Sequence, residues 1–248
     1  MGWLSNMFGK KEGGEGGGDR GVLRLQKKLM NKYVNTTERK RVIHTLADMK
    51  SDEAIFALLG RFSYVTDGSI VDEDEKELVY EIIRSKGEAA APALEHFVKA
   101  EMAIYWPLRA YTELRGEPAA VHLLFAALDT IEDRWERSME RMNSLVSSLR
   151  DYHLPEVLEK LIELSTDDSE EIRFLAVDGL STFDDYQDAI DAVVDRLLDV
   201  EETHRVKTFI MDLLIDRKWT VKRYRKELSG KIPEGYFVDD TGVVQRRF

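Results

Sequence analysis

Apolar residues recur at helical spacing along almost the whole chain from Val22 onward. Each helical pattern gives way to a short polar or glycine-containing break, after which another helical pattern begins. Three of these starts place a capping residue three positions before a glutamate, at Asn35, Asp72 and Asp168. A capping box of this kind satisfies N–H groups that the first helical turn leaves without partners. The pattern therefore predicts an all-α chain built from consecutive helical hairpins.

The predicted hairpins recur with a regular period. Their second helices open near Asp52, Glu88, Glu117, Leu154 and Tyr186, roughly 30 to 40 residues apart. Repeats of this length stack so that every hairpin buries its apolar face against its neighbours. We therefore predict a right-handed α-α superhelix, a solenoid of five to six hairpins. Residues 65–71 and a long helix over residues 129–149 depart from the ideal repeat length.

The most regular copy of the repeat lies at residues 168–180. There an acidic cap is followed by the pair Ile172-Arg173 and by a run of small residues that ends at Gly179-Leu180. This arrangement resembles a HEAT repeat, and weaker copies lie at residues 38–46 and 106–111. The resemblance implies a HEAT-like solenoid over roughly residues 35–220. It implies a function within the range of HEAT proteins, which serve as scaffolds, transport adaptors, enzyme regulators and, in some cases, catalysts.

The N-terminal end differs from the repeat domain, which is expected over residues 21–230. Residues 1–20 combine apolar positions at helical spacing with the pair Lys10-Lys11 and a glycine-rich tract over residues 13–18. The apolar positions are Trp3, Leu4, Met7 and Phe8. Such a segment is too short for a membrane span or a signal-peptide core. It is either a disordered terminus or a hook on a flexible linker that docks weakly to a membrane or a protein.

Residues 231–248 are expected to form a C-terminal hairpin or tail. Two short apolar stretches, residues 235–238 and 243–244, flank a polar turn that ends in Gly242. Glycine at that position suits the left-handed backbone of a hairpin turn. An isolated hairpin is marginal in water, so we expect Tyr236, Phe237 and Phe248 to lean on the repeats or on a partner.

The composition of the chain restricts the classes of partner and site that we expect. The chain of 248 residues has 43% hydrophobic residues, a net charge of -11 and no cysteine. The acidic balance disfavours nonspecific attraction to nucleic acid or anionic lipid over most of the surface, and it favours a basic or neutral protein partner. The absence of cysteine excludes disulfides, thiolate metal sites and a cysteine nucleophile. Cytoplasmic localisation is the resulting expectation.

Catalytic and metal motifs are not recognisable. The five histidines are scattered one to a repeat, and none forms the paired motif of a zinc hydrolase. The glycine tract is not followed by the Lys and Ser or Thr of a phosphate loop, and no nucleophile elbow occurs. We therefore predict no catalytic residue, no cofactor site and no metal site.

An acidic ladder is the clearest charged feature. Asp188, Asp191, Asp195 and Asp199 recur at helical spacing, and like charges at this spacing repel. Residues 217–226, taken as the only strongly basic run of the chain, are expected to supply counter-charges from Lys222, Arg223 or Arg225 to Asp191 and Asp195. The alternatives are a face that binds cations or basic peptides and a solvated face without a role.

The basic run also suggests a second hypothesis, because Trp219 and Tyr224 are interleaved with it. HEAT-like DNA glycosylases and α-solenoid bilin lyases exist, but no motif of either matches here residue by residue. We favour an aromatic core with a basic C-terminal helix and do not expect nucleic acid as the partner.

The sequence therefore favours a non-enzymatic scaffold or adaptor that binds a protein or peptide segment along the face of the second helices. The predicted contacts are charged residues of those helices and of the basic run that follows. They are Arg61, Glu95, Lys99, Glu159, Glu163, Asp188, Asp191, Asp195 and Arg223.

Overall fold

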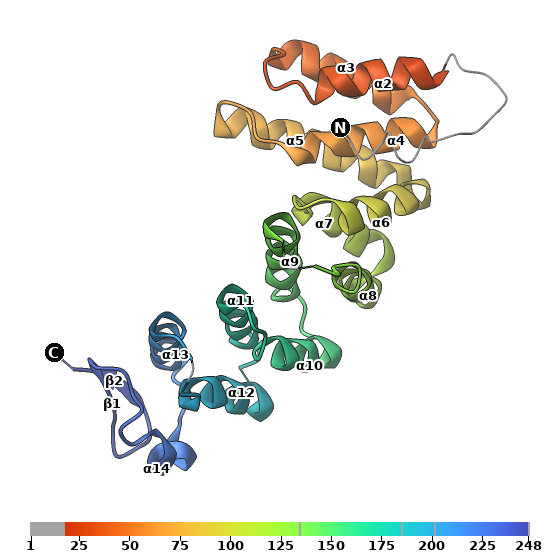
Figure 1. Ribbon diagram of the computed structural model, residues 1–248. Helices are drawn as coiled ribbons and strands as arrows, with labels where there is room; N and C mark the ends of the chain where they lie inside the picture. Colours follow the sequence, from red (N-terminus) through yellow and green to blue (C-terminus); the bar gives the residue numbers. More distant parts are fainter. Residues whose placement is uncertain (1–17, 134, 185, 201, 248) are drawn as a thin grey trace. The chain divides into compact units, whose positions relative to one another are not determined.

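The fold is all-α apart from one small antiparallel hairpin within the described residues, which confirms the predicted fold class (Figure 1). A computed structural model describes residues 18–133, 135–184, 186–200 and 202–247. The chain divides into two compact units, residues 1–144 and 145–248, and each is described by itself. The single repeat domain expected over residues 21–230 and its superhelical handedness stay predictions. The apolar positions between Trp3 and Phe8 lie outside the described residues.

The first unit is a continuous series of packed helices. From α2 to α8, every helix contacts the helix two places along the chain, as α2 does with α4 and α6 with α8. Contacts confined to near neighbours are typical of repeat architectures. The elements are α2 (Gly18–Leu29), α3 (Thr36–Asp48), α4 (Asp52–Leu59), the 3-10 turn η1 (Gly60–Ser63), α5 (Ser69–Lys86), the 3-10 turn η2 (Gly87–Ala90), α6 (Ala91–Ala100), α7 (Tyr105–Arg115) and α8 (Glu117–Leu128). The boundary between the two units falls within α9 (Glu136–Leu149).

Helix starts in this unit follow the predicted pattern with two exceptions. The Asn35 side chain accepts a hydrogen bond from the Glu38 N–H at 2.9 Å and so caps α3 as expected. The capping box predicted at Asp72 is wrong, because α5 already begins at Ser69 and the Asp72 carboxylate bonds elsewhere. The long helix predicted over residues 129–149 is also wrong, since α8 ends at Leu128 and α9 begins only at Glu136.

The second unit continues with helices that pack in the same way. α10 contacts α11 and α12, and α13 contacts α11, α12 and strand β2. α10 begins at Pro155, which suits the first helical turn because proline has no N–H to leave without a partner. The helix after Asp168 exists as predicted, but Ser169 occupies its N-cap position. The elements are α10 (Pro155–Leu164), α11 (Glu170–Leu180), α12 (Gln187–Leu198), α13 (His204–Asp216), the 3-10 turn η3 (Lys222–Tyr224), α14 (Arg225–Leu228), β1 (Tyr236–Val238) and β2 (Val244–Arg246).

Two arginines bind neighbouring helix pairs together in the same manner. Arg39 and Arg173 each lie four residues after the N-cap residue of their helix. The Arg173 guanidinium donates to both carboxylate oxygens of Glu202, at 2.8 and 2.9 Å, and to the backbone carbonyls of Asp167 and Asp168. Arg39 likewise donates to the Glu75 carboxylate, as described below, and to the carbonyls of the segment before α3. The Arg173 pair is bidentate and fixes both distance and orientation, whereas Arg39 shares its Nε–H between the two oxygens of Glu75.

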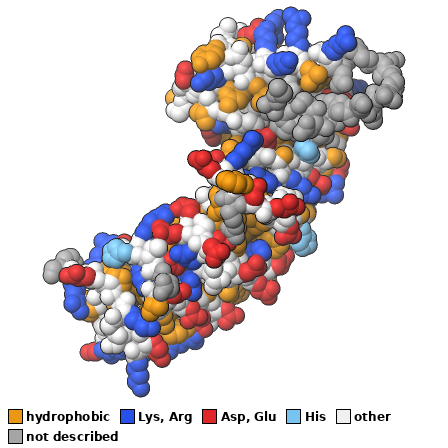
Figure 2. Space-filling view, viewed as in Figure 1, with side chains coloured by type: hydrophobic (Ala, Val, Ile, Leu, Met, Phe, Trp, Pro, Cys, Tyr) orange, Lys and Arg blue, Asp and Glu red, His pale blue; other side chains and the backbone are white. Residues whose placement is uncertain are grey.

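Charge is unevenly distributed along the chain. Residues 18–50, which form α2 and α3, contain nine Lys and Arg against three Asp and Glu. Residues 145–203 show the opposite bias, with four against 17, and residues 204–248 return to a basic balance, with 11 against six. Figure 2 shows Lys and Arg side chains gathered over the end of the first unit that α2 and α3 form.

The hairpin closes the C-terminal end of the second unit, as predicted. Val238 pairs with Val244 across the strands, and Gly242 has the left-handed backbone expected of it, with φ at 89°. The Gly242 carbonyl accepts a hydrogen bond from the Val221 N–H at 2.8 Å. The Tyr236 hydroxyl donates to Asp212 of α13 at 2.6 Å, so this side chain leans on the helices as expected, whereas Phe248 lies outside the described residues.

We predict that Gly242→Ala destabilises the second unit more than Gly235→Ala. Both glycines have positive φ, so an alanine at either site costs about 1–2 kcal/mol of backbone strain. A Cβ at Gly242 would also lie 2.5 Å from Cβ and 2.6 Å from Cα of Lys222, whereas a Cβ at Gly235 would meet nothing within 4 Å. This overlap adds about 1–3 kcal/mol. Urea unfolding of both variants measures the difference, and equal losses would contradict the close approach of the turn to Lys222.

Candidate functional site

The predicted partner contacts of the first unit lie in different environments. Lys99, near the end of α6, is exposed as expected. Glu95 on the same helix is half-buried, and its carboxylate accepts a hydrogen bond from the Tyr111 hydroxyl at 2.9 Å. Arg61 has no exposed surface at all, so the prediction that it offers an exposed contact is wrong.

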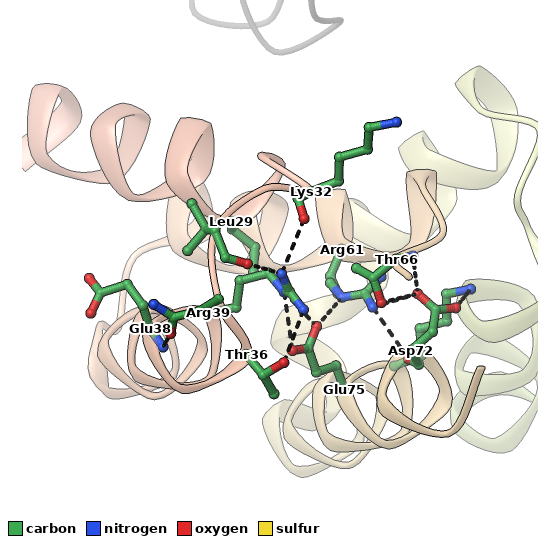
Figure 3. Close-up of polar contacts among 12 residues, drawn as sticks. Leu29, Lys32, Thr36, Glu38, Arg39, Arg61, Thr66, Asp72 and Glu75 are labelled. Atoms are coloured by element: carbon green, nitrogen blue, oxygen red, sulfur yellow. Dashed lines mark hydrogen bonds and ion pairs between the residues drawn. The ribbon is translucent and has the colours of Figure 1, made fainter. Parts of the chain in front are cut away.

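Arg61 is buried because the chain forms the 3-10 turn η1 after α4 and directs this side chain toward α5. There two carboxylates balance its charge (Figure 3). The Arg61 Nε atom donates to Oε2 of Glu75 at 2.9 Å, and its Nη2 atom donates to Oδ1 of Asp72 at 2.7 Å. A buried guanidinium is tolerated only when paired in this way.

Glu75 lies between two arginines in this buried network. Its carboxylate receives Nε of Arg39 at 2.9 Å from one side and Nε of Arg61 from the other. Asp72 receives the Thr66 N–H at 2.8 Å and the Lys76 ammonium at 2.6 Å in addition to Arg61. The network therefore joins α3, η1, the segment before α5 and α5 itself, and every charged member has a counter-charge.

The carboxylates of this network are paired with cations and do not line a cavity. Burial alone would raise the pKa of Asp72, but hydrogen bonds from Lys76 and Arg61 outweigh it and hold that pKa well below its usual range. The carboxylate is thus ionised and fully paired at neutral pH. Two cavities border described residues, one of about 320 Å³ lined by Ile83, Arg84, Leu94 and Glu113, among others, and one of about 350 Å³ beside the hairpin. The buried network lines neither of them.

In the second unit, exposed carboxylates gather on α10 and α12. Glu159, Asp188 and Asp195 are exposed, and in the described part of the chain none of the three has an ion-pair partner. Glu163 pairs with Lys160 on its own helix at 2.9 Å. These two helices contact each other, and we refer to their exposed carboxylates as the acidic surface.

The predicted pairing between the acidic ladder and the basic run is confirmed for Asp191 and not for Asp195. Arg223 and the Tyr224 hydroxyl both bond to the Asp191 carboxylate, and Gln187 donates to it at 2.7 Å. Burial raises the pKa of Asp191, but these hydrogen bonds outweigh it and lower the pKa overall. Arg225 turns instead to Asp240 of the hairpin at 2.8 Å.

Asp195 is left exposed because the basic run is not one continuous helix. It consists of a 3-10 turn followed by the single turn of α14, so only its first residues reach α12. Trp219 in the same run is 5% exposed, which leaves no free ring face for stacking on a base. Arg217 is paired with Asp184 at 3.1 Å.

One charged surface was missed in the sequence. Arg20, Arg24 and Lys27 are exposed on α2, although the run at residues 217–226 had been taken as the only strongly basic one. Their spacing of four and three residues places them on one helical face. A count of charges over each predicted helix, rather than over consecutive residues, would have revealed them.

Comparisons with known proteins add no assignment. Neither the models of known protein families nor the curated proteins give a match to this chain.

Within the described residues, no group of three or more metal-binding side chains comes together. No helix in the part of the chain that the structure describes is long and apolar enough to cross a membrane.

We predict that Arg61→Met destabilises the first unit by about 3–5 kcal/mol, because it leaves buried Asp72 and Glu75 without a shared counter-charge. The control Arg84→Met removes an exposed arginine that pairs at 3.4 Å with Glu81 and costs at most about 1 kcal/mol. Urea unfolding measures both.

The pH dependence follows from the lowered pKa of Asp72. The stabilisation of the first unit by ionised Asp72 is complete above its unfolded-state pKa near 3.8 and is lost as the pH falls below that value.

Equal losses of stability in Arg61→Met and Arg84→Met would rule out a structural role for the buried network.

The Asp191 pairing is tested by a double-mutant cycle with Asp191→Asn and Arg223→Gln. We expect a small favourable coupling that shrinks at raised salt, because the Arg223 side chain is half exposed. The matched cycle of Asp195→Asn with Arg223→Gln should give none. A coupling as large for Asp195 as for Asp191 would contradict the arrangement of the two helical turns.

Proposed function

We propose that the protein is a non-enzymatic helical-repeat scaffold that binds a basic protein segment along α10 and α12 of its second unit. The observation that carries this proposal is the set of exposed carboxylates on these helices, Glu159, Asp188 and Asp195, which lack counter-charges within the described chain. Surface charges in such an array select a partner of opposite sign and speed its association.

The packing of the helices supports a scaffold of the HEAT-like type. Contacts run between helices that are near in sequence, and an arginine at the same position of α3 and α11 joins successive pairs. Extended surfaces built from such repeats bind segments of other proteins. The apolar positions Trp3, Leu4, Met7 and Phe8 provide a second, weaker docking element in this proposal.

The enzyme and nucleic-acid alternatives have less support. An enzyme would place buried titratable groups against a cavity, whereas the buried carboxylates of the first unit are fully paired and closed off. A nucleic-acid site on the basic run would need exposed aromatic rings, and Trp219 is buried there.

The proposal is tested by capture of binding proteins from extracts of the native host on the full-length chain. A charge-reversed variant, Glu159→Lys with Asp188→Lys and Asp195→Lys, should retain at least tenfold less of the specifically bound protein, with the largest difference at low salt. The matched control reverses three exposed acidic residues outside α10 and α12, namely Asp151, Glu227 and Glu234.

Only a loss confined to the first variant supports the acidic surface. Equal capture by both variants would move the partner site elsewhere. Turnover of a substrate by the purified chain would replace the scaffold with an enzyme.

A further inference from the structure

The outward face of α2 is uniformly basic. Arg20, Arg24 and Lys27 form a stripe along the helix and are exposed. The opposite side of the helix is buried through Val22, Gln26 and Leu29, which pack against the rest of the first unit. At 3.6 residues per turn, the centres of these two stripes lie on opposite sides of the helix axis. The three charges therefore point directly away from the core.

These charges are not neutralised within the described chain. Neighbouring Lys28 pairs with Glu38, and Arg223 and Arg225 of the C-terminal run have acidic partners. In contrast, no described acidic side chain pairs with Arg20, Arg24 or Lys27. The first described helix of a helical array needs a polar outer face for solubility, but a mixed or acidic face would meet that need equally well in a chain with net charge -11.

We propose that the basic face of α2 docks the protein onto an anionic lipid surface. The stripe lies on the exposed side of α2 and lines neither of the two cavities described above, so it suits a broad array of phosphates rather than an enclosed anion. Each Lys or Arg near an anionic leaflet contributes independently to binding. Tyr33, 85% exposed, and Met30, 37% exposed, follow the stripe at the end of the helix and provide apolar surface for the interface.

The charge distribution determines which end of the first unit faces an anionic membrane. Residues 18–50 have a net charge of +6, whereas residues 51–144 of the same unit have a net charge of -9. An anionic membrane therefore attracts the α2 end of the first unit and repels residues 51–144. This docking goes beyond the proposed scaffold function and does not depend on it, since the acidic surface lies in the other unit.

A lipid surface explains more of the chain than nucleic acid does. Stable membrane docking takes two weak signals, one basic and one apolar. The sequence immediately before α2 contains Trp3, Leu4, Met7 and Phe8, followed by Lys10-Lys11. Nucleic acid would instead be gripped by several aromatic rings interleaved with the basic residues, whereas no aromatic residue lies among those of α2 and the exposed ring of Tyr33 follows the helix.

The test is flotation of the full-length protein with vesicles of phosphatidylcholine alone and with vesicles that also contain phosphatidylglycerol. We expect binding only to the anionic vesicles and a strong decrease at raised salt. The variant Arg20→Gln with Arg24→Gln and Lys27→Gln should bind roughly 100-fold more weakly, from about 1 kcal/mol per charge and 1.4 kcal/mol per tenfold. Glutamine favours helix, so α2 should stay folded, which circular dichroism checks.

A matched control replaces three exposed lysines outside α2, namely Lys99, Lys222 and Lys226, and should bind as the unmodified protein does. A Trp3→Ser and Phe8→Ser variant should bind more weakly but keep its preference for anionic vesicles, because α2 is intact.

Four results with vesicles would overturn the proposal. The first two are no preference for anionic vesicles and binding by the α2 variant as strong as that of the unmodified protein. The others are a loss of binding in the lysine control equal to that of the α2 variant, and loss of the preference for anionic vesicles in the Trp3 and Phe8 variant. Binding of duplex DNA in place of vesicles, or saturable binding of inorganic phosphate, would assign the face to a different ligand and also overturn it.

Discussion

An arginine, buried in the first unit and partly buried in the second, reaches from one helix pair to a glutamate of the next and is the interaction on which both units depend. Arg39 and Arg173 occupy the same position in their helices, and each donates to a carboxylate and to the carbonyls of the segment before its own helix. The hydrophobic effect is non-directional, whereas the bidentate guanidinium of Arg173 meets Glu202 in one geometry and Arg39 directs its Nε–H between the two oxygens of Glu75. The arginines thus complement the hydrophobic core, which supplies most of the stability but little of the alignment.

The glutamates that complete these pairs do not occupy equivalent positions. Glu75 lies inside α5, but Glu202 precedes the N-cap of α13. In the first unit Glu75 is shared with Arg61, and Asp72 and Lys76 extend the charged cluster. The second unit has a simpler arrangement, in which Arg196 approaches the same Glu202 at 3.9 Å. The two units therefore share the position of the arginine, whereas the glutamate that pairs with it lies at a different position in each unit.

The sequence was sufficient wherever structure depends on local chemistry. The cap at Asn35 and the hairpin turn at Gly242 follow from neighbouring residues, and they were predicted. It was insufficient where residues far apart in the chain meet. Asp72 and Glu75 have the spacing of a capping box, and only the approach of Arg39 and Arg61 shows that they are buried acceptors. Similarly, the exposure of Asp195 depends on how the basic run folds after α13.

The position of the arginine also bears on how such a chain can grow during evolution. Because Arg173 and its glutamate belong to successive helix pairs, an internal gene duplication that copies one whole pair with its connecting segment provides the new junction with both members of the interaction. A duplication with boundaries inside a repeat would separate them and leave a charge buried alone, which costs several kcal/mol. Selection against that cost favours gain and loss of complete helix pairs.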